Sequence, residues 1–219
     1  MLVQIFEVQS PEEAAALVRL GVDHIGVLVG DGAFPRELSI ASTKAIFAAV
    51  PVGHKRVALS LSPTLEEVAR VVEETRPDIV QVQAEIDNFP VEMTRALKTS
   101  FPEVSIMRAI PVIDETSIET AASCRGVADF LLLDTYDTGK RQFGALGRVH
   151  DWNLSRRIVD EIGIPVILAG GLGPDNVAAA ITAVRPAGVD SKTRTDQTDG
   201  TAKNLEKVEA FVAAAKLTR

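Results

Sequence analysis

Asp134 is the residue of this sequence whose position most clearly suggests a catalytic role. It closes the most apolar run of the chain, "FLLLD", and a polar stretch follows it at once. A carboxyl group at the end of a buried strand is partly desolvated, which raises its pKa and suits it to donate a proton. We therefore predict that Asp134 is a general acid. A helix cap or a structural hydrogen bond is the alternative role.

A phosphate site is predicted in the last third of the chain. The segment "ILAGGLGPDNV" ends an apolar run with Gly170 and Gly171 and enters a helical pattern at Pro174. Glycines let backbone N–H groups approach an anion closely, and a helix N-terminus favours negative charge. Lys192 and Arg194, in "VDSKTRTD", add positive charge. Alternatively, the glycines only form tight turns and the two cations face solvent.

Two arginines are candidate substrate ligands. Arg36, in "GAFPREL", could hold a substrate carboxylate in a bidentate fork, or it could form an ordinary surface ion pair. Arg108 lies inside an apolar run, where a buried charge needs a partner. We predict that Arg108 pairs with a carboxylate such as Asp134 or with the ligand.

These residues need elements that bring them together, and the chain supplies a regular series of them. Apolar runs cover residues 2–8, 24–29, 56–61, 78–83, 104–110, 129–134, 165–170 and 187–190. Helical patterns follow them, beginning near Pro11, Ser39, Thr64, Pro90, Glu115, Asn153, Pro174 and Lys203. Continuously apolar strands are typical of parallel sheets that are covered on both faces. Eight such units predict an α/β fold, a (β/α)₈ TIM barrel with residues 1–219 as a single domain, and an open doubly wound sheet is the alternative.

The composition of the chain limits the classes of binding partner that we expect. The 219 residues carry a net charge of -7, which argues against nucleic acid or an anionic membrane surface. The single cysteine, Cys124, excludes an internal disulfide and a multi-cysteine metal site. No apolar run reaches the ~20 residues that a bilayer requires, no signal peptide is expected, and nothing predicts a metal or a cofactor. We expect a cytoplasmic monomer or homodimer that acts on a small phosphorylated substrate.

Several segments, in order along most of the chain, resemble phosphoribosylanthranilate isomerase, a (β/α)₈ enzyme of tryptophan biosynthesis. They are "PEEAAALVRLGVDHIGVLV", "FPRELS", "DIVQVQAE", "FLLLDT", "GRVHDW" and "PVILAGGLGPDNVAAAI". The resemblance implies an Amadori rearrangement with Asp134 as the general acid. It also implies that Arg36 meets the carboxylate of anthranilate, that Gln81 faces the substrate, and that Ser191 belongs to the phosphate site.

The chain departs from the family pattern at the catalytic base. The family has a cysteine at the end of the first strand, and that position aligns with Phe6, which cannot transfer a proton. Cys124 precedes the sixth strand and should lie at the opposite end of the barrel. Strand alternation places Phe6 inward and Glu7 toward the helices, unless the strand ends early. Possible sources of a base are Glu7, His24, Asp31 and Glu85.

Three functions stay open at this point. The preferred one is isomerisation of a phosphorylated sugar or sugar amine, with Asp134 as the acid. The second is another phosphosugar enzyme, an aldolase or lyase, in which Lys192 forms a Schiff base. The third is a non-catalytic protein that binds phosphosugars.

Overall fold

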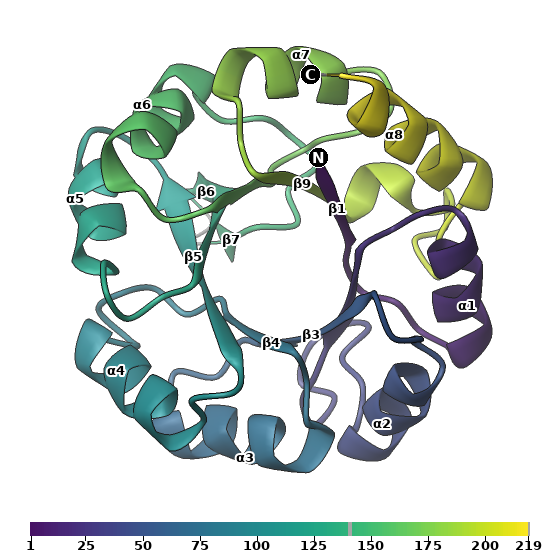
Figure 1. Ribbon diagram of the computed structural model, residues 1–219, viewed down its shortest axis with the longest axis horizontal. Helices are drawn as coiled ribbons and strands as arrows, with labels where there is room; N and C mark the ends of the chain where they lie inside the picture. Colours follow the sequence, from purple (N-terminus) through teal and green to yellow (C-terminus); the bar gives the residue numbers. More distant parts are fainter. Residues whose placement is uncertain (140–141, 219) are drawn as a thin grey trace.

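The computed structural model describes residues 1–139 and 142–218, and in this part of the chain eight parallel strands close into a ring (Figure 1). Each strand pairs with its neighbours, and the pairings of β1 with β9 and of β5 with β6 complete the circle. The strands are β1 (Leu2–Ile5), β2 (His24–Leu28), β3 (Lys55–Ser60), β4 (Ile79–Val82), β5 (Ser105–Val112), β6 (Phe130–Asp137), β8 (Val166–Leu168) and β9 (Gly188–Ser191). The predicted (β/α)₈ barrel is confirmed, and the open sheet is excluded.

The helices form an outer ring around these strands (Figure 1). They are α1 (Pro11–Arg19), α2 (Ile40–Ala48), α3 (Leu65–Thr75), α4 (Val91–Ser100), α5 (Thr116–Ser123), α6 (Trp152–Ile162), α7 (Val177–Val184) and α8 (Leu205–Leu217). Local chemistry fixes several of the starts. The Ser10 hydroxyl accepts a hydrogen bond from the Glu13 amide, and Ser39 caps α2 in the same way.

Apolar side chains fill two separate layers. One layer lies inside the barrel and includes Phe6, Leu28, Met107, Leu132 and Ile167. The other packs between the strands and the helices. Because successive strand residues point to opposite faces, membership of a layer shows which side chains enter the barrel.

The first strand and a short additional strand show the main differences from the sequence prediction. The first strand ends at Ile5 instead of residue 8, because Glu7 adopts a φ of 62° that breaks the strand. A two-residue strand, β7 (Gln142–Phe143), pairs antiparallel with the end of β6 and was not predicted.

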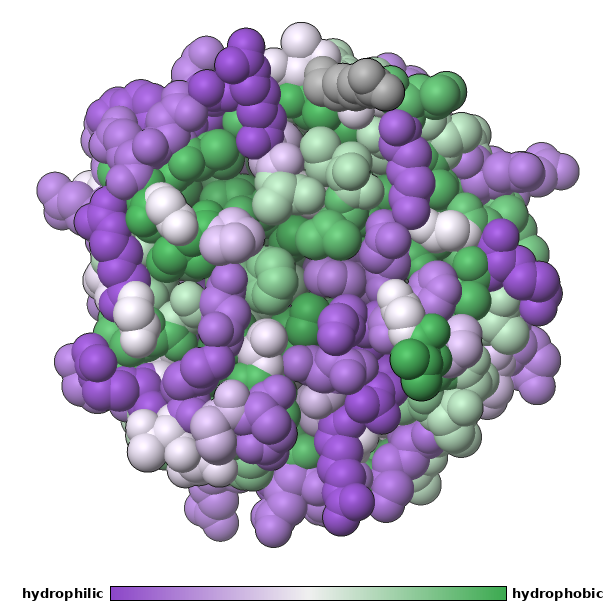
Figure 2. Space-filling view, viewed as in Figure 1, coloured by the Kyte–Doolittle hydropathy of each residue, from purple (hydrophilic) through white to green (hydrophobic). Residues whose placement is uncertain are grey.

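The outside of the molecule is largely polar. In Figure 2 hydrophilic side chains project around the rim, and hydrophobic side chains show in patches between them. Within residues 1–139 and 142–218, the helices are too short or too polar to cross a membrane.

Candidate functional site

The barrel mouth holds two inward-facing carboxylates at one level. Leu133 pairs with Leu168, and Leu168 pairs with Val189, so the next residue on each strand lies at the same height. Those next residues are Asp134, Ala169 and Asp190. Adjacent strands are about 4.8 Å apart, so the Cα atoms of the two aspartates are separated by roughly 10 Å. Alanine between them leaves space above the barrel floor.

Asp134 has the properties of a proton donor. Its Oδ1 atom accepts a hydrogen bond of 2.7 Å from the Thr135 amide. Burial nevertheless raises the pKa of the Asp134 carboxyl to about 7, so a large fraction of it is protonated at neutral pH. The role of general acid stays a prediction, and this environment supports it.

Asp190 is the functional candidate that the sequence reading missed. The residue is 7% exposed, and its Oδ1 atom has no hydrogen-bond partner among the described residues. Burial, followed by the charge of Asp134, raises the pKa of Asp190 to about 8. The available signal was its position, because it closes a short apolar run just as Asp134 closes a longer one.

The residues predicted to bind phosphate do converge on one cavity, and Asp134 and Asp190 also line it. Ser191 is fixed there because its hydroxyl donates to the Leu172 carbonyl at 2.7 Å. The predicted residues on the wall are Gly170, Gly171, Ser191, Lys192 and Arg194. Their role as phosphate ligands stays a prediction.

The glycine pair is required by the fold itself. Gly170 and Gly171 have φ values of 82° and 62°, which L side chains rarely adopt. A Cβ atom at Gly171 would lie 2.5 Å from the Arg148 carbonyl carbon, and one at Gly170 would lie 2.5 Å from Thr135 Oγ1. The close approach of the segment before α6 therefore explains both glycines, and anion binding would be an additional use of the same turn.

Both cations of this cavity already have carboxylate partners. Arg194 donates to both carboxylate oxygens of Asp175 at 2.7 Å. The Lys192 ammonium lies 3.2 Å from Glu7 Oε2 and 3.7 Å from Asp196 Oδ2. A bound phosphate would therefore share these cations with protein carboxylates.

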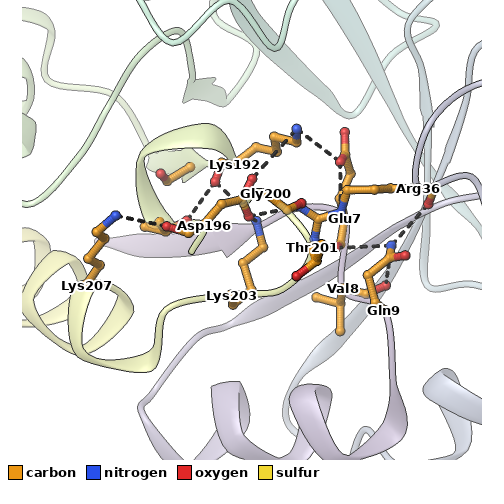
Figure 3. Close-up of polar contacts among 12 residues, drawn as sticks. Glu7, Val8, Gln9, Arg36, Lys192, Asp196, Gly200, Thr201, Lys203 and Lys207 are labelled. Atoms are coloured by element: carbon orange, nitrogen blue, oxygen red, sulfur yellow. Dashed lines mark hydrogen bonds and ion pairs between the residues drawn. The ribbon is translucent and has the colours of Figure 1, made fainter. Parts of the chain in front are cut away.

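Arg36 lies in a buried ionic network at the edge of the mouth (Figure 3). Its Nη1 atom is 3.0 Å from Asp196 Oδ1 and donates to the Gly200 carbonyl, and its Nη2 atom donates to the Glu7 carbonyl. Lys203, whose side chain is fully buried, pairs with the same Asp196 oxygen at 2.6 Å. A substrate carboxylate at Arg36 would have to displace these protein partners.

Glu7 points into the mouth, not toward the helices. The expectation that it faces the helices fails because β1 ends at Ile5 and the positive φ of Glu7 turns its side chain. Its carboxylate lies 3.4 Å from Arg36 Nε and also contacts Lys192. Both ion pairs are made by the same carboxylate oxygen, Oε2.

The prediction for Arg108 was wrong. Met107 and Ala109 face the barrel interior, so Arg108 points outward into the helix layer. It is fully buried there, donates to the carbonyls of Ala84 and Phe89, and stacks over the Phe89 ring at 5.2 Å. Its partners are carbonyls and a ring, and it lies away from both Asp134 and the cavity.

A second cavity adjoins the first and shares Asp134, Asp190 and Lys192 with it. Phe6 and Gln81 line this cavity, as expected for an inward Phe6 on the pocket floor. Gln81 donates to Gln83 Oε1 at 2.8 Å. The remaining wall is mainly apolar and includes Leu28, Leu59, Leu61, Leu132 and Phe143.

The other proposed sources of a base lie elsewhere. His24 begins β2, at the end of the barrel opposite the mouth, and burial lowers its pKa to about 4. Asp31 is 88% exposed and lies 3.5 Å from Arg70. Glu85 accepts a hydrogen bond from the Tyr136 hydroxyl at 3.0 Å. Cys124 follows α5 and precedes β6, at the end of the barrel opposite the mouth as expected, and it is buried between the strands and the helices.

Comparison with known proteins points to one family. The family described as N-(5'-phosphoribosyl)anthranilate (PRA) isomerase matches residues 3–214. The N-(5'-phosphoribosyl)anthranilate isomerase of Methanocella arvoryzae is 35% identical over 217 residues, which cover 99% of each chain. The phosphoribosyl anthranilate isomerase of Thermotoga maritima superposes with a TM-score of 0.84 at 26% identity, covering 99% of this chain and 98% of that one.

A further solved structure contains a bound ligand. It is a phosphoribosyl anthranilate isomerase in complex with reduced 1-(o-carboxyphenylamino)-1-deoxyribulose 5-phosphate. It superposes with a TM-score of 0.82 at 25% identity and covers 99% of this chain and 98% of that one.

Proposed function

The chain belongs to the N-(5'-phosphoribosyl)anthranilate isomerase family, and on this premise we propose that it catalyses an Amadori-type isomerisation of a phosphorylated sugar amine. Asp134 is the general acid. One observation carries the proposal: a carboxyl group whose pKa lies about 7 shares a cavity with a glycine turn, Ser191 and Lys192. A proton donor and an anion site are thus within reach of one small molecule.

The acid acts on the ring oxygen of the ribosylamine. The Asp134 carboxyl gives its proton to that oxygen, and the bond from the oxygen to C1 breaks. The electron pair of the breaking bond stays on the oxygen, which becomes a hydroxyl, and the nitrogen lone pair forms a double bond to C1. Removal of the C2 proton then gives an enolamine, and proton transfer to C1 gives the 1-amino-2-ketose. Proton donation at this step is worth a factor of about 10² to 10⁴ in rate.

The two adjoining cavities divide the substrate between them. The phosphate binds beside Gly170, Gly171 and Ser191, with Lys192 and Arg194 at its edge. The substituent on nitrogen extends into the second cavity, where Phe6 and apolar neighbours present a surface suited to an aromatic ring. The sugar then spans the carboxylates at the mouth.

The aldolase alternative gains no support. A Schiff base forms through the free amine of a lysine, whereas the Lys192 nitrogen is held in ion pairs with Glu7 at 3.2 Å and Asp196 at 3.7 Å. Attack on a carbonyl would have to break these ion pairs. A binding protein without catalysis also gives no role to the raised pKa of Asp134. The cytoplasmic location and the monomer or homodimer state stay predictions.

Turnover of phosphoribosylanthranilate tests the proposal directly, by following the anthranilate chromophore in a fluorimeter. The wild-type protein should convert it, and Asp134→Asn should lower kcat by about 10² or more because the acid is lost. Asp160→Asn is the matched control, since that side chain is 52% exposed on α6 and pairs with Arg156. A wild-type protein without turnover, or an Asp134→Asn variant with full activity, would contradict the proposal.

A further inference from the structure

We propose that Asp190 is the catalytic base of this protein and removes the C2 proton of the substrate, replacing a cysteine that the chain lacks at Phe6. This inference rests on the proposed isomerisation and adds the second half of its proton transfer. The proposed isomerisation needs a residue that removes the C2 proton, in addition to the acid Asp134.

The geometry favours Asp190 on three counts. It faces inward at the same level as Asp134, with only Ala169 between them. It lines both cavities, so it lies where the phosphate region and the apolar region meet. Its Oδ1 atom is buried and accepts no hydrogen bond from any residue that the structure describes. A carboxylate oxygen without a partner, aimed into a cavity, is available to a substrate proton.

The spacing of the two aspartates matches the size of the reacting unit. The Cα atoms are roughly 10 Å apart, as the strand spacing requires. Each carboxyl group extends inward from its strand, so a sugar ring placed between them would have its ring oxygen toward one and C2 toward the other. The small side chain of Ala169 leaves this space open, and a larger residue there would close it.

The competing carboxylates are less suited to the task. Glu7 lies beside the lost cysteine position, but Arg36 and Lys192 both contact its Oε2 atom, at 3.4 and 3.2 Å. Glu85 is engaged by the Tyr136 hydroxyl. Removing a proton from C2 would require Glu7 to give up two ion pairs, whereas Asp190 gives up none.

The proton balance closes with these two residues alone. The cycle starts with Asp134 protonated and Asp190 ionised. After Asp134 has opened the ring, Asp190 takes the C2 proton, the C–H electron pair forms the C1–C2 double bond, and the C1–N double-bond pair returns to nitrogen. Asp190 then gives its proton to C1 while the C2 hydroxyl gives its proton to Asp134. The ketose forms and both carboxyl groups recover their starting state.

The pair should hold one shared proton in its active form. The charged groups that act on Asp190 are Asp134, Lys203 and Glu7, and two of the three are carboxylates. Two carboxyl groups that interact strongly lose their protons in two separate steps. Asp190 has the higher pKa, about 8 against about 7 for Asp134, so the shared proton lies mostly on Asp190 and the reactive arrangement, with the proton on Asp134, is the minor form of the pair. Activity should still rise and fall with pH in a bell, because neither the doubly protonated nor the doubly ionised pair can supply both an acid and a base.

Steady-state kinetics with phosphoribosylanthranilate test the assignment, using Asp190→Asn, Asp190→Glu and the Asp160→Asn control. Asparagine keeps the size of the side chain but cannot accept the proton. Asp190→Asn should lower kcat by about 10² or more with KM changed far less, and the acidic limb of the pH profile should disappear. Asp190→Glu should recover part of kcat because it restores a carboxylate.

The outcomes separate this inference from the proposed function. An active wild-type protein whose Asp190→Asn variant keeps kcat within tenfold overturns the role of Asp190 and leaves the isomerase intact. A variant that loses activity through KM or unfolding alone, with a normal pH profile, overturns it as well, because a base acts on kcat. A wild-type protein that does not convert the substrate overturns both proposals.

Discussion

Replacing Asp134 with asparagine should stabilise the protein, and the gain should grow with pH. The folded state raises the pKa of this carboxyl to about 7 from an ordinary 3.8, because burial disfavours the charged form. Below pH 3.8 the group is protonated in both states, so its contribution to stability is fully present there. As pH rises toward 7 the unfolded chain releases the proton before the folded one does, and that contribution is lost.

The size of the effect follows from the difference in pKa. A difference of about 3 pKa values, at about 1.4 kcal/mol each, gives a loss of about 4 kcal/mol above pH 7. Asparagine does not titrate and escapes this loss. Between pH 5.5 and pH 7 the free energy of unfolding of Asp134→Asn should therefore gain about 2 kcal/mol on that of the wild type.

Urea unfolding followed by the fluorescence of Trp152, the single tryptophan, measures this difference. Asp160→Asn serves again as the control, because it makes the same substitution at an exposed carboxylate on α6, outside the cavity. A difference between Asp134→Asn and wild type that does not change with pH, at equal m-values, would refute the reasoning. It would mean that the Asp134 carboxylate is as well solvated in the barrel mouth as in the unfolded chain.

Other substitutions test the surrounding framework. Lys203→Met should cost about 3–5 kcal/mol in urea unfolding, because it leaves a buried carboxylate with one cation fewer, whereas Met at the exposed Lys44 should cost less than about 0.5 kcal/mol. Gly171→Ala should lower Tm by far more than Gly53→Ala, because both have positive φ but only Gly171 would meet backbone atoms at 2.5 Å. Arg108→Met should leave KM within twofold and the free energy of unfolding unchanged or raised. The reason is that the Arg108 charge is buried outside the cavity and faces carbonyls. A large rise in KM would instead indicate that Arg108 binds the substrate.

The elements were predictable because each one carries its own local signal. Predicted helix starts fall within three residues of the observed ones, as at Ser39, which caps α2, and at Pro11, which begins α1. The strands are apolar on both faces, which identifies a covered parallel sheet. The two-residue strand β7 was missed because so short a segment has no periodicity to recognise.

Because the strands are apolar on both faces, the sequence could not show which side chains point into the barrel and which point toward the helices. In "VSIMRAI" the neighbours of Arg108 are apolar on both sides, so alternation could not show whether its charge enters the barrel. Residues at strand ends were easier, because a closed barrel brings all those ends to one mouth. That is why Asp134, Gly171 and Lys192, far apart in sequence, line a single cavity.

Glu7 shows what residue type alone leaves open. Its position after an apolar run suggested a continuing strand, yet its φ of 62° belongs to a conformation that a glutamate rarely adopts. The surrounding ion pairs hold it there: Arg36 and Lys192 both contact its carboxylate, and Arg36 also binds its carbonyl. Those contacts form only once the loops after β2 and β9 are in place, so no local pattern could reveal them.

This network also makes Glu7 less suited than Asp190 to replace the cysteine that the family has at the position of Phe6. The charges nearest that position are bound to one another, and Asp196 joins Arg36 to the buried Lys203. The network therefore pairs Glu7 with two cations, Arg36 and Lys192. Asp190, two strands from Asp134, keeps an oxygen without such a partner. The assignment of Asp190 moves the base only from the end of β1 to the neighbouring strand β9, because Gln4 pairs with Asp190 and the Phe6 amide donates to the Ser191 carbonyl.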